Sequence, residues 1–246
     1  MIDWTWVVNH LDELVARTIQ HLLFTVVAVV LGFAISFSLS LWAVRRRRVY
    51  APITGVAGIL YTIPSLALFA ALVPITGLSI LTAIIPLVLY TILILVRNVV
   101  AGFDAVPADV NEAADGMGYT GRQRLRAVEL PLALPLIVAG VRVASVSTIG
   151  RVTITGALGD RFGGLGFFIF EGYRRGFPTE ILFGAIPAMI LAITVDLSLV
   201  AAQGRLSPWS RAHPDMSLST LDTVTPDAMP GGAAACWDSW VRSSPG

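Results

Sequence analysis

Residues 22–48 read LLFTVVAVVLGFAISFSLSLWAVRRRR, an uncharged apolar run that ends in four consecutive arginines. The uncharged part, 22–44, is long enough to cross a bilayer, since a transmembrane helix needs about 20 apolar residues. Arginines directly after such a run are typical of its cytoplasmic end, because loops rich in Lys and Arg are retained on that side. The stretch therefore predicts a membrane-spanning helix whose C-terminal end faces the cytoplasm.

The composition of the whole chain agrees with a membrane protein. Of its 246 residues, 55% are hydrophobic and 13% are charged, whereas about a quarter of the residues in soluble domains are charged. A soluble domain of this size exposes too much surface to be built almost entirely from core residues. The formal net charge is +1, and the 17 basic residues, all arginines, are scattered along the chain. We therefore expect no nucleic-acid partner.

Charge-free runs elsewhere in the chain predict further spans. The longest, 49–96, is too long for one helix, and the sequence Pro74-Ile75-Thr76-Gly77 divides it. The fold class predicted is all-α, a polytopic membrane helix bundle of about five transmembrane helices within residues 21–205. The five spans are expected at about 22–44, 52–73, 78–96, 132–158 and 181–203.

The arginines also predict the orientation of the bundle. With Arg45–Arg48 in the cytoplasm, five spans place the N-terminus outside and the C-terminus inside. Ten arginines then lie on the inner side, against four on the outer side: Arg17, Arg161, Arg174 and Arg175. This asymmetry is the one expected of a multi-pass membrane protein. It places the segment 104–131, between the third and fourth spans, in the cytoplasm.

The two ends of the chain differ from the bundle. Residues 1–20 carry Trp4, Trp6 and several aliphatic residues at roughly helical spacing, which fits a helix lying in the outer membrane interface with its tryptophans at headgroup depth. The same residues also fit a frayed lead-in to the first span. Residues 206–246 are rich in Pro, Ser, Thr and Gly without a sustained period, and we expect a disordered cytoplasmic tail.

The cytoplasmic segment is polar inside an otherwise apolar chain. It contains Glu112-Ala113-Ala114-Asp115-Gly116-Met117-Gly118 and ends at Leu130-Pro131. We expect a short helix over about 110–126, because acidic residues near its start suit the positive end of a helix dipole. Small residues on one face would let another surface come close, so the helix suits docking into a groove. The alternative is an ordinary loop that is rich in Ala and Gly.

Three motifs resemble those of one transporter family. The cytoplasmic segment is similar to the coupling loop of type I ABC-importer permeases, and Tyr61–Leu68 is similar to the "IPSLAL" segment of the osmoprotectant group. Gly163-Gly164-Leu165-Gly166 follows in the loop after the fourth span. The resemblance covers about 22–203. The chain is therefore similar to permease subunits that carry glycine betaine, choline or carnitine.

The resemblance implies a fold, a set of partners and a location. It implies the type I ABC importer permease fold in a bacterial cell membrane, with a second permease subunit that is identical or paralogous. A dimer of ATPase subunits would dock on the cytoplasmic face, and a separate extracytoplasmic protein would deliver the substrate. The coupling residues implied are Glu112, Ala113, Ala114, Gly118, Leu130 and Pro131.

The same resemblance implies a subunit that is not an enzyme. The chain has no G-x-x-x-x-G-K-[ST] phosphate loop and no lysine to build one, so no cofactor is expected here and Mg-ATP would bind the partner ATPase. It also lacks H-E-x-x-H and G-x-S-x-G motifs. Two alternatives stay open: a permease for a different small solute such as an amino acid or related amine, and a secondary transporter without an ATPase. The latter usually shows inverted repeats, which are not evident in this chain.

Three ionisable residues fall inside the predicted spans, where charges are costly and often functional. Counted at about 1.5 Å per residue, Arg142 and Asp196 lie at similar depths, so we expect them to pair. The pair is either a clamp between helices or part of a substrate pathway. Arg151 lies nearer the outer end, where it either lines the pathway or extends to the outer surface.

Aromatic and glycine-rich segments complete the candidate sites. Quaternary amines are held by aromatic rings, and Tyr61, Phe69 and Tyr90 are the aromatics of the second and third spans; each either packs or forms such a cage. The outer loop, 160–178, combines aromatics with Gly163, Gly164 and Gly166. It is either an external gate that receives a binding protein or a cap that seals the bundle.

Overall fold

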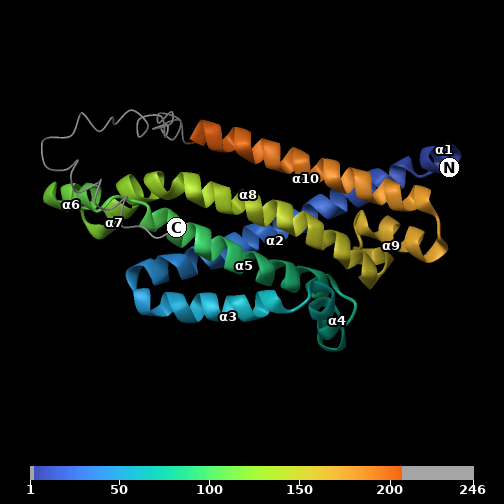
Figure 1. Cartoon of the computed structure of the whole chain (residues 1–246), viewed down its shortest axis with the longest axis horizontal. Coiled ribbons are helices and arrows are strands. Elements are labelled where there is room, and N and C mark those ends of the chain that lie inside the picture. Colours follow the sequence, from blue (N-terminus) through green and yellow to red (C-terminus); the bar gives the residue numbers. More distant parts are fainter. Residues whose placement is uncertain (1–2, 207–246) are drawn as a thin grey trace, which may run out of the picture. The chain divides into compact units, whose positions relative to one another are not determined.

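The computed structural model describes residues 3–206, and all of the regular structure in them is helical (Figure 1). The expected disordered tail, 207–246, lies outside the described residues. The all-α class predicted from the sequence is confirmed. The longer helices are α1 (Trp4–Asn9), α2 (Leu11–Arg45), α3 (Tyr50–Thr62), α4 (Ser65–Thr76), α5 (Ile80–Asp104), α6 (Ala108–Gly116), α8 (Leu130–Ile154), α9 (Gly166–Arg175) and α10 (Pro178–Leu206).

Short helical turns join these elements. A 3-10 turn, η1 (Arg47–Val49), follows α2. The helix α7 (Gly121–Arg124) continues through a π-helical segment, η2 (Leu125–Glu129), directly into α8. Two 3-10 turns, η3 (Thr155–Leu158) and η4 (Asp160–Phe162), then lead to α9. The predicted fourth span, 132–158, is therefore the later part of one continuous helix over Gly121–Leu158.

Within residues 3–206, four helices are long and apolar enough to cross a membrane, and the number of spans is five if a bent pair of helices counts as one span. The bent pair replaces the single helix expected over 52–73: the segments Arg47–Thr62 and Ser65–Thr76 meet at an angle of 93°. Pro64 causes the break, because it has no N–H to continue the helix and disfavours helical geometry at Ile63. Ile63 is accordingly extended, with φ −67° and ψ 127°.

The N-terminal segment also differs from expectation. Either an interfacial helix over 1–20 or a lead-in to the first span was expected; α1 ends at Asn9, and residues 11–20 form the first turns of the long helix α2. The short α1 is capped by Asp3, whose carboxylate accepts a hydrogen bond from the Trp6 N–H. Trp6 packs edge-on against Phe177 and Phe183. This packing joins α1 to the start of α10 rather than leaving it free.

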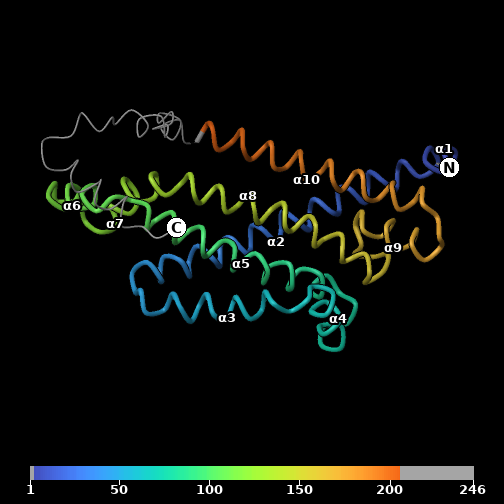
Figure 2. The backbone as a smooth tube through the Cα atoms, viewed as in Figure 1, coloured from blue at the N-terminus to red at the C-terminus, as the bar shows by residue number. Residues whose placement is uncertain are grey.

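Helix α5 is the centre of the bundle and packs on α2 and α8 (Figure 2). Glycines on α2 and α8 allow the close approach. A Cβ added at Gly32 of α2 would lie 1.8 Å from Thr91 Oγ1 of α5. A Cβ added at Gly140 of α8 would lie 2.4 Å from Asn98 Cβ, also on α5. Such contacts are typical of membrane bundles, where small residues let helix backbones approach.

Buried apolar clusters extend along α5. One cluster contains Phe24, Phe69, Leu87 and Val152, and another contains Val99, Phe103, Ala133 and Ile137. By contrast, the most apolar part of α10 has no buried residue within the described chain. This part of α10 therefore presents its apolar side chains to lipid or to another subunit.

The long helices lie side by side, and the shorter elements gather at their ends (Figure 1). Helices α6 and α7 lie at one end of the bundle, whereas α1 and α9 lie at the other. The two candidate regions of the sequence, the loop 104–131 and the loop 160–178, are thus at opposite ends.

We expect Gly140→Ala to destabilise the bundle, because its Cβ would force α5 and α8 apart. Overpacking of this kind costs about 1–3 kcal/mol. Gly150→Ala, on the same helix, is the matched control, since an added Cβ there meets nothing within 4 Å. Thermal unfolding of the detergent-solubilised protein should show a lower Tm for Gly140→Ala and an unchanged or raised Tm for Gly150→Ala. Equal Tm values for the two variants would contradict the packing argument.

Candidate functional site

Helix α6 is the exposed part of the loop 104–131. It covers Ala108–Gly116 rather than the expected 110–126, and Pro107 stands at its N-cap. The helix ends in a Schellman motif: the Tyr119 N–H donates to the Ala114 carbonyl at 3.1 Å, and the Gly118 N–H donates to the Asp115 carbonyl at 3.0 Å. Gly118 has φ +81°, a conformation that favours glycine. A requirement for glycine at this position thus follows from the geometry.

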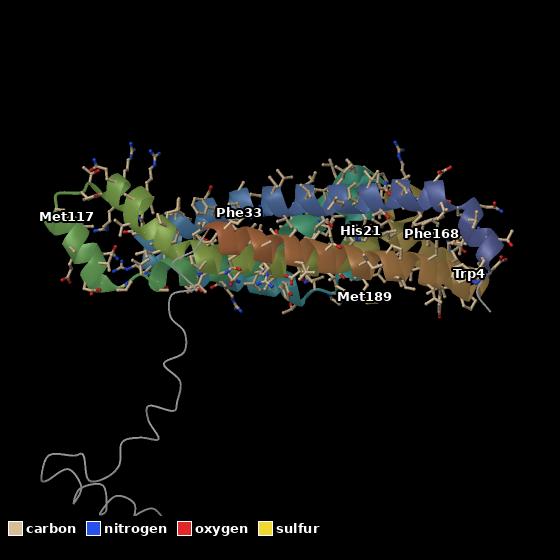
Figure 3. The ribbon with its side chains drawn as sticks, turned by 90° about the horizontal axis from the view of Figure 1, so that it is seen from above. Trp4, His21, Phe33, Met117, Phe168 and Met189 are labelled. Atoms are coloured by element: carbon tan, nitrogen blue, oxygen red, sulfur yellow. The ribbon has the colours of Figure 1, made fainter. Side chains whose placement is uncertain are left out.

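The side chains of α6 divide between its surface and its interior. Glu112 and Ala113 are exposed, whereas Ala114 is buried, at 1% exposure, against its own chain. Met117 is 67% exposed and lies at the tip of this end of the bundle (Figure 3). The surface available to a partner therefore includes a large apolar side chain that the sequence analysis did not single out, although its place inside the loop motif could have drawn attention to it.

Arg124 connects α6 to the long helix that follows. Its guanidinium pairs with Asp115 at the end of α6, and its Nε donates to Glu129 Oε1 at 2.8 Å. The hydrogen bond to Glu129 has the larger effect and the one to Asp115 the next; both raise the pKa of Arg124 above its ordinary value. Arg124 thereby joins the end of α6 to the segment that leads into α8.

Leu130 and Pro131 begin α8. Leu130 is partly buried and packs against the inner apolar cluster that contains Phe103 and Ala133. Pro131 stands in the first turn of α8, inside the continuous helix Gly121–Leu158, and because it lacks an N–H it removes one backbone hydrogen bond there. The π-helical segment η2 lies directly before them. Segments of this kind are rare and occur frequently at functional sites.

The structure brings Arg142 and Asp196 together. Arg142 Nε donates to Asp196 Oδ1 and Nη2 donates to Oδ2, both at 3.0 Å, in a bidentate pair between α8 and α10. The two side chains are 30% and 34% exposed. They border a cavity of about 520 Å³ that Ser147 also lines. The pair is therefore a clamp between helices and at the same time part of a cavity wall.

Arg151 is placed differently. Its guanidinium lies 4.7 Å from the centre of the Tyr90 ring and 5.1 Å from that of Tyr61. It also donates a hydrogen bond to the Ser147 hydroxyl one turn earlier on α8. The Tyr90 hydroxyl donates to the Ile63 carbonyl at the break between α3 and α4. Arg151 thus contacts the broken span rather than the outer surface.

Phe69, the third aromatic of the second and third spans, is fully buried in the apolar cluster around α5. It is therefore a packing residue, whereas Tyr61 and Tyr90 form an edge-on pair with ring centres 5.7 Å apart.

The glycines of the outer loop allow it to pack tightly against the bundle. A Cβ added at Gly166 would lie 1.8 Å from the Thr153 carbonyl oxygen, and one added at Gly163 would lie 2.8 Å from Phe167 Cβ. Gly164 has φ +47°, and a Cβ there would meet His21 at 3.1 Å. These contacts make the loop a close-fitting cover over the outer ends of α2 and α8.

His21 holds this cover in place, and the sequence analysis missed it. Its ring is fully buried: Nε2 donates to the Ile149 carbonyl at 3.0 Å, and Nδ1 accepts from the Leu165 N–H at 3.3 Å. Both ring nitrogens are thus engaged, one with α8 and one with the outer loop. Its side chain lies inside the bundle toward the end that carries Phe168 (Figure 3). A single histidine near the start of an apolar run gives little signal in the sequence.

Comparisons with known proteins agree with one another. A family model described as "Binding-protein-dependent transport system inner membrane component" matches residues 28–212. The chain is 36% identical over 196 residues to the choline transport system permease protein OpuBB of Bacillus subtilis (strain 168), which covers 80% of this chain and 89% of that protein. It is also 36% identical over 208 residues to the osmoprotectant import permease protein OsmW of Salmonella typhimurium. That alignment covers 82% of this chain and 96% of OsmW.

The fold is similar to solved structures as well. An inward-facing structure of the MetNI methionine ABC transporter contains a chain that aligns with a TM-score of 0.70 at 23% identity. The alignment covers 80% of this chain and 98% of that one. At this identity the likeness concerns the fold.

The pair between Arg142 and Asp196 can be tested by a double-mutant cycle. We expect Arg142→Met and Asp196→Leu each to lower stability, because each leaves one charge unpaired between apolar helices. The double variant should recover most of the loss, with a coupling energy of about 1–3 kcal/mol. The measurement is thermal unfolding in detergent, with the exposed Arg126→Met as control. Purely additive losses would show that the two side chains do not stabilise each other.

Proposed function

We propose a solute for this chain, which belongs to the family of binding-protein-dependent transport system inner membrane components and is a permease subunit of an ABC importer. The proposed solute is a small osmoprotectant such as glycine betaine, choline or carnitine. The observation that supports this solute class is the 36% identity, over four-fifths of the chain, to permeases named for choline and for osmoprotectants. The predicted family is thereby confirmed, and the solute follows as a proposal.

In this proposal ATP is hydrolysed by a partner, and α6 receives the force. A dimer of ATPase subunits with bound Mg-ATP docks on the exposed Glu112, Ala113 and Met117 at the α6 end of the bundle. The Schellman turn at Gly118 and the bridge through Arg124 support this role, since they tie α6 to the start of α8. Leu130 and Pro131 anchor that start. Ala114, being buried, supports the helix from within.

The transport cycle proposed is rigid-body alternating access. ATP binding draws the two ATPase subunits together and moves two permease subunits to an outward-facing state, and hydrolysis resets them. Such a ligand shifts the equilibrium only through its different affinities for the two states. The unburied apolar surface of α10 leaves room for a second permease subunit, identical or paralogous, or for lipid.

We further propose the orientation that the arginines predict. The chain is an inner membrane component with several apolar helices; its N-terminus lies outside and its C-terminus in the cytoplasm. The α6 end then faces the ATPase, and the α9 end faces a substrate-binding protein. Arg174 and Arg175 on α9 are exposed, which supports docking there. The tight cover formed by Gly163, Gly164 and Gly166 acts as the external gate.

A second candidate solute class is an amino acid or a related amine. The likeness to the MetNI methionine ABC transporter does not distinguish the two classes, because at 23% identity it concerns the fold alone. The curated relatives are more similar in sequence, and they favour the quaternary amines.

The solute is tested by uptake into proteoliposomes. We expect the complex of this chain with its ATPase, partner permease and binding protein to accumulate radiolabelled glycine betaine, choline or carnitine when ATP is enclosed with the ATPase. Methionine and histidine serve as the comparison solutes. ATP-dependent uptake of an amino acid but of no quaternary amine would replace the first solute class by the second. Uptake that needs no ATPase would refute the coupling.

The docking surface is tested by Glu112→Arg. We expect this charge reversal to abolish co-purification of the ATPase, because it puts a cation in place of the exposed carboxylate on α6. Asp12→Arg makes the same change of charge at an exposed position near the opposite end of the bundle and should leave co-purification intact. If Glu112→Arg retains the ATPase as well as Asp12→Arg does, α6 is not the docking helix.

A further inference from the structure

The break between α3 and α4 creates a polar point in an apolar region. Backbone groups freed at such a break cannot face hydrocarbon, so breaks inside membranes occur where protein covers them or where they line a cavity. Here the Tyr90 hydroxyl donates to the Ile63 carbonyl, and the neighbouring Tyr61 ring stands edge-on to Tyr90. Broken helices commonly form the substrate sites of transporters.

Arg151 brings a cation to this break. Its guanidinium lies against both tyrosine rings, at 4.7 and 5.1 Å, and binds the Ser147 hydroxyl. Unlike Arg142, it has no carboxylate within 4.0 Å among residues 3–206. A charge at membrane depth is costly, and two ring faces with one hydroxyl compensate it only in part. An anionic partner would therefore be bound strongly at this point.

The side of α8 next to Arg151 is open. Ser147 lines the cavity of about 520 Å³ beside Arg142 and Asp196. Gly150, adjacent to Arg151, is exposed, and a Cβ added to it meets nothing within 4 Å of the described chain. A small solute in this cavity would lie beside Ser147, one helical turn before Arg151 and hydrogen-bonded to its guanidinium.

We propose that Arg151, seated on Tyr61 and Tyr90, selects solutes by charge: it favours quaternary amines that carry a carboxylate over quaternary amines that are bare cations. The carboxylate of a zwitterion forms charge-assisted hydrogen bonds with the guanidinium, and the trimethylammonium group packs on tyrosine ring faces that the arginine gives up. A bare cation meets the unscreened arginine in a medium of low dielectric constant, where like charges repel strongly. This inference rests on the proposed function and narrows its solute class.

The arrangement argues against the simpler idea that the two tyrosines form an empty aromatic cage. A cage needs open ring faces, and the guanidinium already lies against both rings. A solute that is a bare cation would have to displace the Arg151 guanidinium from the rings, and it brings no anion with which the displaced guanidinium could pair. A zwitterion supplies that anion itself.

The test compares uptake of glycine betaine with uptake of choline and of glycine betaine methyl ester, which both lack the carboxylate charge. The reconstituted complex is used with the same binding protein, loaded to equal occupancy with each solute. Because the binding protein is constant, a change in the uptake ratio between variants arises in the permease. We expect the wild type to favour glycine betaine over both cations at equal occupancy.

The variants separate charge from structure. Arg151→Gln should lower the ratio of betaine to choline uptake by about tenfold or more, since a hydrogen bond between charged groups is lost. Arg151→Lys keeps the charge and should retain most of the preference. Arg205→Gln makes the same change at an exposed position near the end of α10, outside this site, and is the matched control that should keep the wild-type ratio. Assembly of each variant is checked by co-purification of the ATPase.

The outcomes distinguish the two proposals. If Arg151→Gln takes up solute with the wild-type ratio of glycine betaine to choline, Arg151 does not select solutes by charge. The proposed function would be unaffected by that result. Equal wild-type uptake of glycine betaine and its methyl ester also overturns it, and this result needs no variant to fold. If the wild type accumulates no quaternary amine, the proposed function fails and the inference fails with it.

Discussion

The close approach of α5 to its two neighbours is the constraint on which the rest of the molecule depends. Helices in lipid gain little from burying apolar side chains, so their association depends on packing and on the few polar contacts they can share. Gly32 and Gly140 remove the side chains that would keep α2 and α8 away from α5. The broken span packs on α5, and α8 carries both Arg142 and Arg151.

That packed centre also explains why the polar groups are where they are. The positive charges of the two arginines in the predicted spans are compensated in different ways. Arg142 pairs with a carboxylate on α10, and Arg151 lies on two tyrosine rings beside the broken span. His21 uses both ring nitrogens to hold the outer loop on α8. The polar contacts therefore join the rigid centre to the elements that surround it, which is where motion between states would have to occur.

Much of this could be predicted from the sequence, because membrane helices are subject to few and strong constraints. Length and charge were enough to expect about five apolar spans, and counting residues at a constant rise was enough to place Arg142 opposite Asp196. The break at Pro64 was missed because the run 52–73 is uniformly apolar and a single proline can also be accommodated by a kink. The burial of Ala114 and the contacts of His21 depend on tertiary packing, which no local pattern reports. The family was recognised from motifs, and the comparisons confirm it.

The unbroken course of the chain from α7 to the end of η3 has a mechanical consequence. Its 38 residues measure about 57 Å at 1.5 Å per residue, well beyond the roughly 30 Å of bilayer hydrocarbon. A tilt of about 5° at one end would displace the other by about 5 Å, close to the pitch of one helical turn. In the proposed cycle the segment would act as a lever that converts a small rotation at α6 into a larger movement near Arg151. The π-helical segment Leu125–Glu129 lies at the base of this lever, so the stiffness of that segment would set how much of a movement at α6 reaches the far end.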